Sequence, residues 1–165
     1  MKLNLGLIIE DKAWREEDFI SKNYIKNIVK DTLNHLEVFN SISEIELALL
    51  LTNDKKMQEL NKSFLSKDKP TNVLSFPDVE IKNTELLEFT KSKDYIYLGD
   101  IAMGYNVIKL EATDANLTMR DHFTHLLVHG VLHLVGYDHI IPLEEEVMTR
   151  LEVDILKKYG ISSPY

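Results

Sequence analysis

The stretch His129–His139, which reads HGVLHLVGYDH, decides how this chain is organised. His129 and His133 stand four positions apart, so in a helix their imidazoles share one face, about one turn apart. Gly136 is suited to end that helix, because glycine adopts the left-handed conformation at little cost. The chain then turns back and brings His139 to the pair. We predict a site of three nitrogen ligands with an open fourth position, which is typical of a catalytic zinc centre.

The predicted helix that carries these histidines has two different faces. At helical spacing one stripe contains the imidazoles of His122, His125, His129 and His133. The opposite stripe is apolar and is expected to pack on a sheet; it contains Phe123, Leu127, Val131 and Leu134. His122 and His125 lie too far along the helix to join His139 in one site. We interpret them either as residues that support the ligands or contact substrate, with His125 the substrate-binding candidate, or as ordinary polar surface.

The histidine spacing is also that of HExxHxxGxxH, the signature of the metzincin proteases. Those enzymes carry a glutamate general base where this chain has Gly130. A peptidase mechanism of that type therefore lacks its proton acceptor. A zinc peptidase stays open as an alternative, and so does the reading that the histidines are merely packed or solvated. Three histidines at this spacing around a glycine favour the metal site.

Composition narrows the class of protein further. With 165 residues, 44% of them hydrophobic, the chain suits a single domain with its own core. It has no cysteine, so a metal must be held by nitrogen and oxygen. The formal net charge of −8 argues against a broad basic surface that coats nucleic acid. No apolar run is long enough to span a bilayer and no signal peptide is evident, so we expect a cytoplasmic protein without membrane contact.

Periodicity predicts alternating strands and helices along the chain. Strands are expected over residues 3–9, 45–51, 73–76 and 95–103. Five helices are expected: over 16–36, after the caps at 52–54, over 106–111, from 118 to Gly136, and from Pro142 to Gly160. The segment between 77 and 94 is weakly periodic, and one helical turn around Leu86 is expected there. Gly99 inside the last strand indicates a bulge or a close backbone approach.

Further blocks carry a family resemblance. HGVLHLVGYDH occurs together with LNKSFLSKDKPTNVLSFP at 60–77, LGDI at 98–101, and an ending that contains Met148, Glu152 and a final PY. In this order, over nearly the whole chain, the blocks resemble the YbeY family of metal-dependent endoribonucleases. The resemblance implies one α+β domain over residues 1–165. Its expected form is a small mixed four-stranded sheet covered by about five helices, with the metal site at the end of a central helix.

The resemblance also implies a function. One zinc ion would be held by His129, His133 and His139, which match the motif histidines of the family. The implied activity is endonucleolytic cleavage of single-stranded RNA in ribosomal RNA maturation, including the 3′ end of 16S RNA, and in the removal of defective ribosomes. The implied partners are ribosomal RNA and the ribosome or its proteins.

Two positions depart from the family pattern. Leu65 stands where members carry an arginine thought to contact RNA phosphate, and Asn72 replaces a common aspartate. Arg120 projects to the helix side opposite the histidines and is not expected to substitute. Lys67 and Lys69 follow in the same loop and can offer point charges to phosphate, without the bidentate fork of arginine.

These departures shape the mechanistic hypothesis. We expect Lys67 and Lys69 to contact substrate phosphate, with Lys67 stabilising the charge that develops during cleavage. Asp138 is expected to orient His139 or a neighbouring backbone group. A rival hypothesis is a ribosome-assembly factor that keeps the metal but cleaves poorly, because Leu65 removes a cationic contact.

Overall fold

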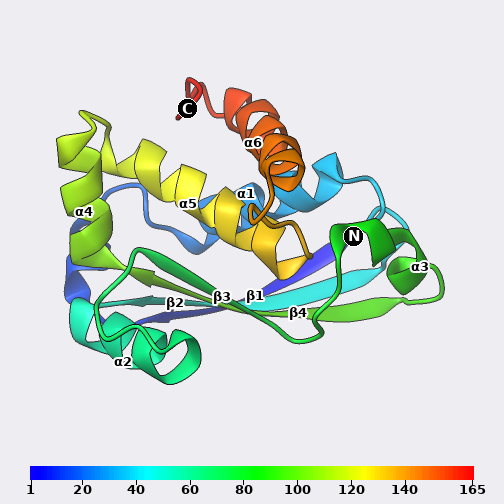
Figure 1. Cartoon of the computed structure of the whole chain (residues 1–165), viewed down its shortest axis with the longest axis horizontal. Coiled ribbons are helices and arrows are strands. Elements are labelled where there is room, and N and C mark those ends of the chain that lie inside the picture. Colours follow the sequence, from blue (N-terminus) through cyan, green and yellow to red (C-terminus); the bar gives the residue numbers. More distant parts are fainter.

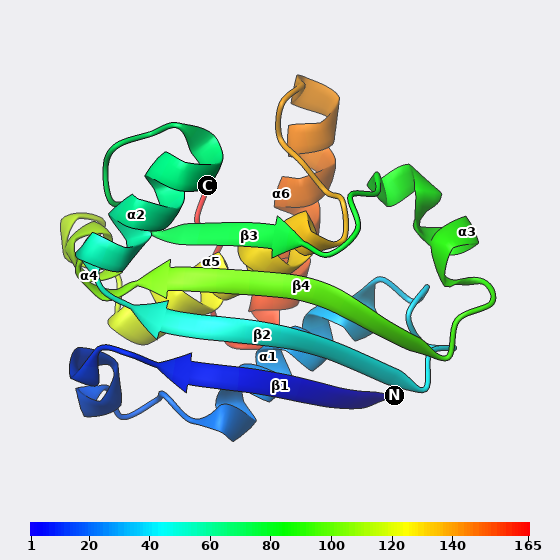
Figure 2. The ribbon, with the colours of Figure 1, turned by 90° about the horizontal axis from the view of Figure 1, so that it is seen from below.

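The computed structural model describes residues 1–165 and contains one four-stranded mixed sheet. The strands are β1 (Lys2–Ile9), β2 (Glu44–Thr52), β3 (Val73–Pro77) and β4 (Tyr95–Gly104), in the order β1-β2-β4-β3. The pairs β1 with β2 and β2 with β4 are parallel, whereas β3 runs antiparallel to β4 at one edge (Figure 2). The predicted strands and the mixed sheet are therefore confirmed.

Helices lie on both faces of this sheet. They are α1 (Lys22–His35), α2 (Asp54–Leu65), α3 (Leu86–Thr90), α4 (Tyr105–Asp114), α5 (Met119–Leu134) and α6 (Pro142–Lys157). Figure 1 shows α1, α5 and α6 over one face and α2 on the other. The sixth helix is α3, which forms where one helical turn around Leu86 is predicted. The α+β architecture is confirmed, with one short helix more than the five expected.

The first helix begins later than its apolar periodicity predicts. The predicted range is 16–36, but α1 begins at Lys22, where the hydroxyl of Ser21 caps it by accepting the Tyr24 N–H at 3.1 Å. Upstream, Trp14 lies in a short 3-10 helix and is fully buried, and its indole N–H donates to the carbonyl of Thr52 at 3.0 Å. The Ser21 cap therefore marks the start of α1, and the residues before it form a separate short helix that buries Trp14.

Gly99 holds the edge strand close to its neighbour. The pairing of β2 with β4 shifts register beside it, and its φ of +130° lies in the region that favours glycine. A Cβ atom there would lie 2.2 Å from the backbone oxygen of Phe76 in β3. The predicted bulge and the predicted close approach both occur. This approach fixes β3, which forms one wall of the cleft described below.

The central helix α5 packs as its sequence predicts. Phe123, Leu127 and Val131 are each fully buried in the main core, and Leu134 is nearly so. The imidazole stripe therefore faces away from the core, toward the space between β3 and α6.

Candidate metal centre

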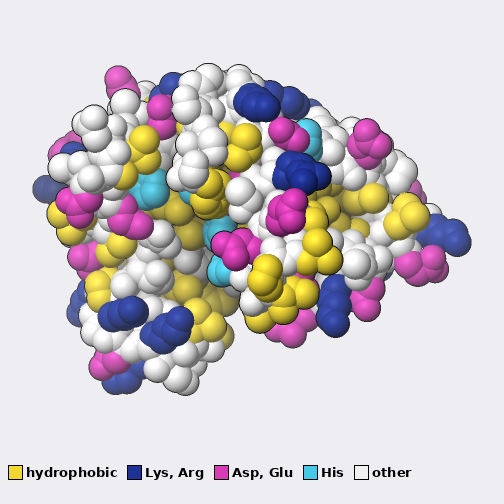
Figure 3. All heavy atoms as spheres, turned by 45° about the horizontal axis from the view of Figure 1, so that its top comes forward, with side chains coloured by type: hydrophobic (Ala, Val, Ile, Leu, Met, Phe, Trp, Pro, Cys, Tyr) yellow, Lys and Arg dark blue, Asp and Glu magenta, His cyan; other side chains and the backbone are white.

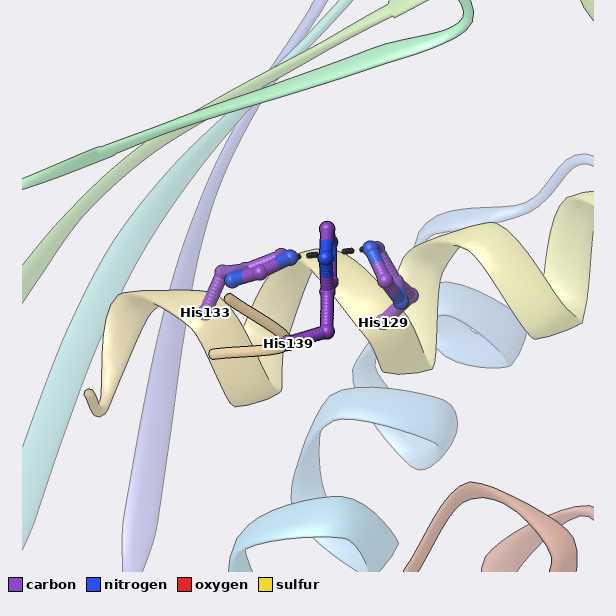
Figure 4. Close-up of side chains that lie close together, drawn as sticks. All are labelled: His129, His133 and His139. Carbon is purple, nitrogen blue, oxygen red and sulfur yellow. Dashed lines mark hydrogen bonds between the residues drawn. The ribbon is translucent and has the colours of Figure 1, made fainter. Parts of the chain in front are cut away.

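Three imidazoles converge beside the C-terminal half of α5. His129 and His133 come from consecutive turns of the helix, and their Nε2 atoms lie 2.9 Å apart. His139 comes from the link to α6, and one ring nitrogen from each of the three residues lies within 4.8 Å of the others. Figure 4 shows the three rings pointing toward one another. The predicted convergence of His139 on the helical pair thus occurs.

The hydrogen bonds of these rings test whether a cation fits. His133 Nδ1 lies 2.9 Å from the carbonyl of Tyr137, which can only accept, so Nδ1 carries the proton. His129 Nδ1 lies 2.5 Å from a carboxylate oxygen of Glu152, so it also donates. Both Nε2 atoms then present lone pairs to each other. A shared cation stabilises this arrangement, which two neutral rings alone do not favour.

A glycine turn delivers the third ligand. Gly136 has a φ of +93°, and a Cβ atom there would lie 2.3 Å from the backbone oxygen of Ile81. Only glycine fits this crowded left-handed position, which follows the end of α5 at Leu134. Beyond it, the Asp138 carboxylate accepts the backbone N–H of His139 at 2.8 Å. This contact is of the kind expected for Asp138, and its role in function stays a prediction.

Glu152 is a residue of the site that belongs to the family resemblance but was given no role from the sequence. It lies on α6, is 1% exposed, and accepts hydrogen bonds from His129 and from the Tyr165 hydroxyl. Burial alone would raise the pKa of Glu152, but the nearby His125 and the hydrogen bonds from His129 and Tyr165 outweigh burial and lower the pKa to about 2. A buried carboxylate that stays ionised beside a ligand histidine fixes the ring and makes the nitrogen more basic.

A signal for Glu152 does exist in the sequence. It occupies the apolar stripe of α6 between Met148 and Ile155, both of which are buried. Charged residues are seldom buried in such a stripe unless they have a partner. An acidic side chain on the buried face of a helix therefore indicates that a basic group or a metal-binding histidine lies opposite it.

The three histidines open into a cleft of about 340 Å³. Its opposite wall is the start of β3 and the residue before it, and its lining also includes His125 and Tyr165. The full lining is Asn72, Val73, Ser75, His125, Leu126, His129, His133, His139 and Tyr165. Figure 3 shows histidine side chains in a hollow of the surface. The structure thus places His125 at the cleft, in contact with Tyr165 at 3.3 Å.

Lys67 and Lys69 lie outside this lining. Both are exposed in the loop between α2 and β3, and the Asn61 side chain holds that loop by donating to the carbonyl of Lys69 at 2.9 Å. The structure therefore does not bring these lysines to the metal ligands. A role for them in substrate binding requires RNA that extends beyond the cleft.

The replacement at Asn72 has a structural reason. Its side-chain amide donates to both carboxylate oxygens of Glu111, at 2.9 and 3.2 Å. An aspartate at this position would place two like charges side by side.

His122 lies 3.7 Å from the same carboxylate of Glu111, and its ring nitrogens are buried without a hydrogen-bond partner. Burial lowers the pKa of His122.

Position 130 cannot supply the missing general base. Gly130 is buried, and its carbonyl accepts the Ser75 hydroxyl at 2.9 Å. A Cβ atom there would meet the side chains of Ser75 and Val73 at 3.3 Å. Glycine has no side chain to act as a base, and the close contacts that a Cβ atom would make leave little room for a carboxylate here. The structure therefore disfavours the peptidase alternative.

The pH dependence of stability should reveal the burial of His133. Burial, followed by the charges of His129 and His139, lowers the pKa of His133 to about 4. Because an unfolded histidine titrates near about 6.5, the unfolded chain binds a proton between these values that the native chain does not. We expect the thermal midpoint of the metal-free protein to fall as pH falls from about 6.5 to about 4, a window set by this shift. A His133→Asn variant measured by calorimetry should lose less stability over the same window, and equal losses would contradict this account.

The fold and the cleft together define a class: an α+β protein built around a candidate three-histidine metal centre. The chain matches the family described as "Endoribonuclease YbeY" over residues 9–160. It is 35% identical over 154 residues to the Endoribonuclease YbeY of Ehrlichia canis (strain Jake), covering 93% of this chain and 92% of that protein. The chain therefore belongs to the YbeY family of endoribonucleases.

A solved structure supports the fold independently. The solution structure of TM1509 from Thermotoga maritima matches with a TM-score of 0.54 at 20% identity, over 95% of this chain and 92% of that one. No helix of this chain is both long and apolar enough to cross a membrane.

Proposed function

We propose that this chain is a zinc-dependent endoribonuclease that cuts single-stranded RNA in ribosomal RNA maturation, including the 3′ end of 16S RNA. Its partners would be ribosomal RNA and the ribosome or its proteins, in the cytoplasm, where it would also act in ribosome quality control. The observation that carries the proposal is the convergence of three ring nitrogens within 4.8 Å of one another in an open cleft, with the Nε2 atoms of His129 and His133 2.9 Å apart. Membership of an endoribonuclease family supports the choice of RNA.

His129, His133 and His139 would hold the zinc, because three imidazoles and no thiolate form the donor set. When bound, zinc supplies Lewis-acid stabilisation of charge at a phosphoryl oxygen. Glu152 and the Tyr137 carbonyl orient two of the ligand rings by accepting their Nδ1 protons. His125 and Tyr165 line the cleft and offer polar atoms to the substrate.

The direct test compares matched substrates. Purified protein should cut a labelled single-stranded RNA, leave the same sequence intact in a duplex, and lose activity when a chelator removes the metal. Zinc should restore the activity. Cleavage that survives complete metal removal would refute the proposed zinc dependence.

The loop lysines carry a separate expectation. We expect Lys67→Ala/Lys69→Ala to weaken binding of a long single-stranded RNA by about threefold to tenfold, because each lysine would neutralise one phosphate. A short oligonucleotide that fits the cleft alone should be unaffected, since neither lysine lines it. The matched control is Lys12→Ala/Lys30→Ala, which removes two exposed lysines elsewhere. If long RNA binds equally well to all three proteins, the lysine loop has no role.

A second candidate is an assembly factor that binds metal but cleaves poorly. The observation that favours it is Leu65, which ends α2 with 52% of its surface exposed where the family carries an arginine. No arginine or lysine lines the cleft to replace that charge.

Leu65→Arg discriminates between these candidates. An exposed position accepts the longer side chain without strain, so stability should stay unchanged. If the chain is a poor nuclease because it lacks this charge, cleavage should rise by about tenfold or more, as expected for a charge-assisted phosphate contact. If it is already a competent nuclease, we expect a gain below about threefold. Leu65→Lys is the control, because lysine adds the same positive charge without the two parallel hydrogen bonds that arginine can donate to a phosphate.

A further inference from the structure

Four large aliphatic side chains are exposed in the segment that follows His139. Ile140 is 79% exposed, Ile141 49%, Leu143 70% and Val147 42%. From Pro142 to Val147 every residue is exposed, and α6 joins the core only at Met148. Figure 2 shows this end of α6 standing clear of the other elements. Neighbouring aliphatics exposed in this way mark an interaction surface more often than scattered single ones do.

A large hollow lies beside this segment. It measures about 850 Å³ and lies between the loop that precedes α3 and the link from α5 to α6. Ile140 and Ile141 line one side, Ile81 and Pro77 line another, and His133 is also part of the lining. The hollow therefore adjoins the metal centre from the side away from Asn72 and Tyr165.

The charge around the hollow is negative. Its lining contains Glu80, Glu85, Asp138 and Glu144 against a single basic residue, Lys82. None of these four carboxylates forms an ion pair. Glu145 adds further acidic charge on the exposed end of α6. A surface of this sign repels a polyanion such as RNA and attracts cationic groups.

We propose that this surface docks a lysine- and arginine-rich amphipathic segment of a partner protein. The acidic docking surface consists of Ile140–Val147 and the hollow beside it. The aliphatic side of the partner segment covers Ile140, Ile141 and Leu143, which removes apolar surface from water. Its basic side chains pair with Glu80 and Glu144. Because the surface begins at the residue after His139, the partner lies against the metal centre while RNA reaches the cleft from the other side.

The test uses two labelled synthetic peptides of equal length and equal positive charge. One places leucines at helical spacing among lysines, and the other replaces every leucine with serine. Fluorescence anisotropy on the full chain should show binding of the leucine peptide and at least about tenfold weaker binding of the serine peptide. Equal binding of both peptides would overturn the proposal, because it would leave only non-specific charge attraction.

Charge-reversal variants locate the site. Glu80→Lys/Glu144→Lys should weaken binding of the leucine peptide by at least about tenfold. Asp18→Lys/Asp114→Lys makes the same change in net charge at two exposed, unpaired positions elsewhere and should stay within about twofold of wild type. Equal weakening in both variants would refute the assigned location.

Aliphatic variants test the other half of the surface. Ile140→Ser/Leu143→Ser removes only exposed apolar groups and should keep the fold while it weakens peptide binding by about fivefold or more. Sedimentation of the wild type alone gives the competing outcome. Self-association that Glu80→Lys/Glu144→Lys abolishes would overturn the partner assignment in favour of a second copy of this chain. A gain in RNA affinity in that variant, with unchanged peptide binding, would show that the carboxylates only repel RNA.

Discussion

Replacing His133 with alanine is expected to abolish both metal binding and RNA cleavage while the fold persists. His133 supplies one of three converging nitrogens through its ring, and its Nδ1 contacts the carbonyl of Tyr137. Two remaining imidazoles bind a divalent ion far more weakly than three, so we expect at least about a 100-fold loss of metal affinity and of cleavage rate. Elemental analysis and a single-turnover cleavage assay on the same sample measure the two losses together.

His35→Ala provides the matched control for this experiment. His35 ends α1, is partly exposed, and has no contact with the three ligands. The control should keep full metal content and activity, and circular dichroism should match among all three proteins. If His133→Ala keeps its metal but loses cleavage, the ring acts on substrate and the metal-ligand assignment fails. If it loses metal but still cleaves, the reaction does not depend on this centre.

What the sequence revealed about this site follows from local geometry. The spacing of His129 and His133 along one helix fixes their relative position whatever surrounds them, because the helical repeat is constant. Gly136 made the return of His139 predictable for the same reason, since its left-handed conformation ends the helix within the segment itself. The strands were predicted equally directly, because residues meant for the two faces of a sheet alternate along the sequence. In β2 buried and less buried residues alternate accordingly.

The rest of the site depends on contacts between distant segments. Glu152 reaches His129 only because α6 packs beside α5, an arrangement that periodicity does not determine. The distance of Lys67 and Lys69 from the ligands depends on a loop held by Asn61, and composition alone describes that loop as a solvated turn. Local rules therefore located the candidate ligands and the nearby Asp138, but not the role of Glu152 on another helix.

Replacing Glu152 with glutamine is the second variant with a large expected effect. The carboxylate accepts the Nδ1 proton of His129 at 2.5 Å, and a glutamine oxygen of nearly the same shape can still accept it. What disappears is the negative charge, which the hydrogen bonds from His129 and Tyr165 favour against burial by lowering the pKa of this carboxyl. Loss of such a partner typically weakens metal affinity by about 10-fold to 100-fold. A competition titration with a chromophoric chelator measures this change directly.

The size of the Glu152→Gln effect separates charge from shape. Glu146→Gln removes a carboxylate from the exposed side of the same helix, where it pairs only with Arg150, and should leave metal affinity unchanged. Tyr165→Phe removes one hydrogen bond to Glu152 but leaves the charge of Glu152 in place. Its effect on metal affinity should therefore lie between the effects of Glu146→Gln and Glu152→Gln. If Glu152→Gln binds metal as tightly as wild type while Glu152→Ala does not, the buried side chain acts by packing and hydrogen bonding alone. In that case its charge contributes nothing to the ligand strength of His129, and the electrostatic role assigned to α6 is wrong.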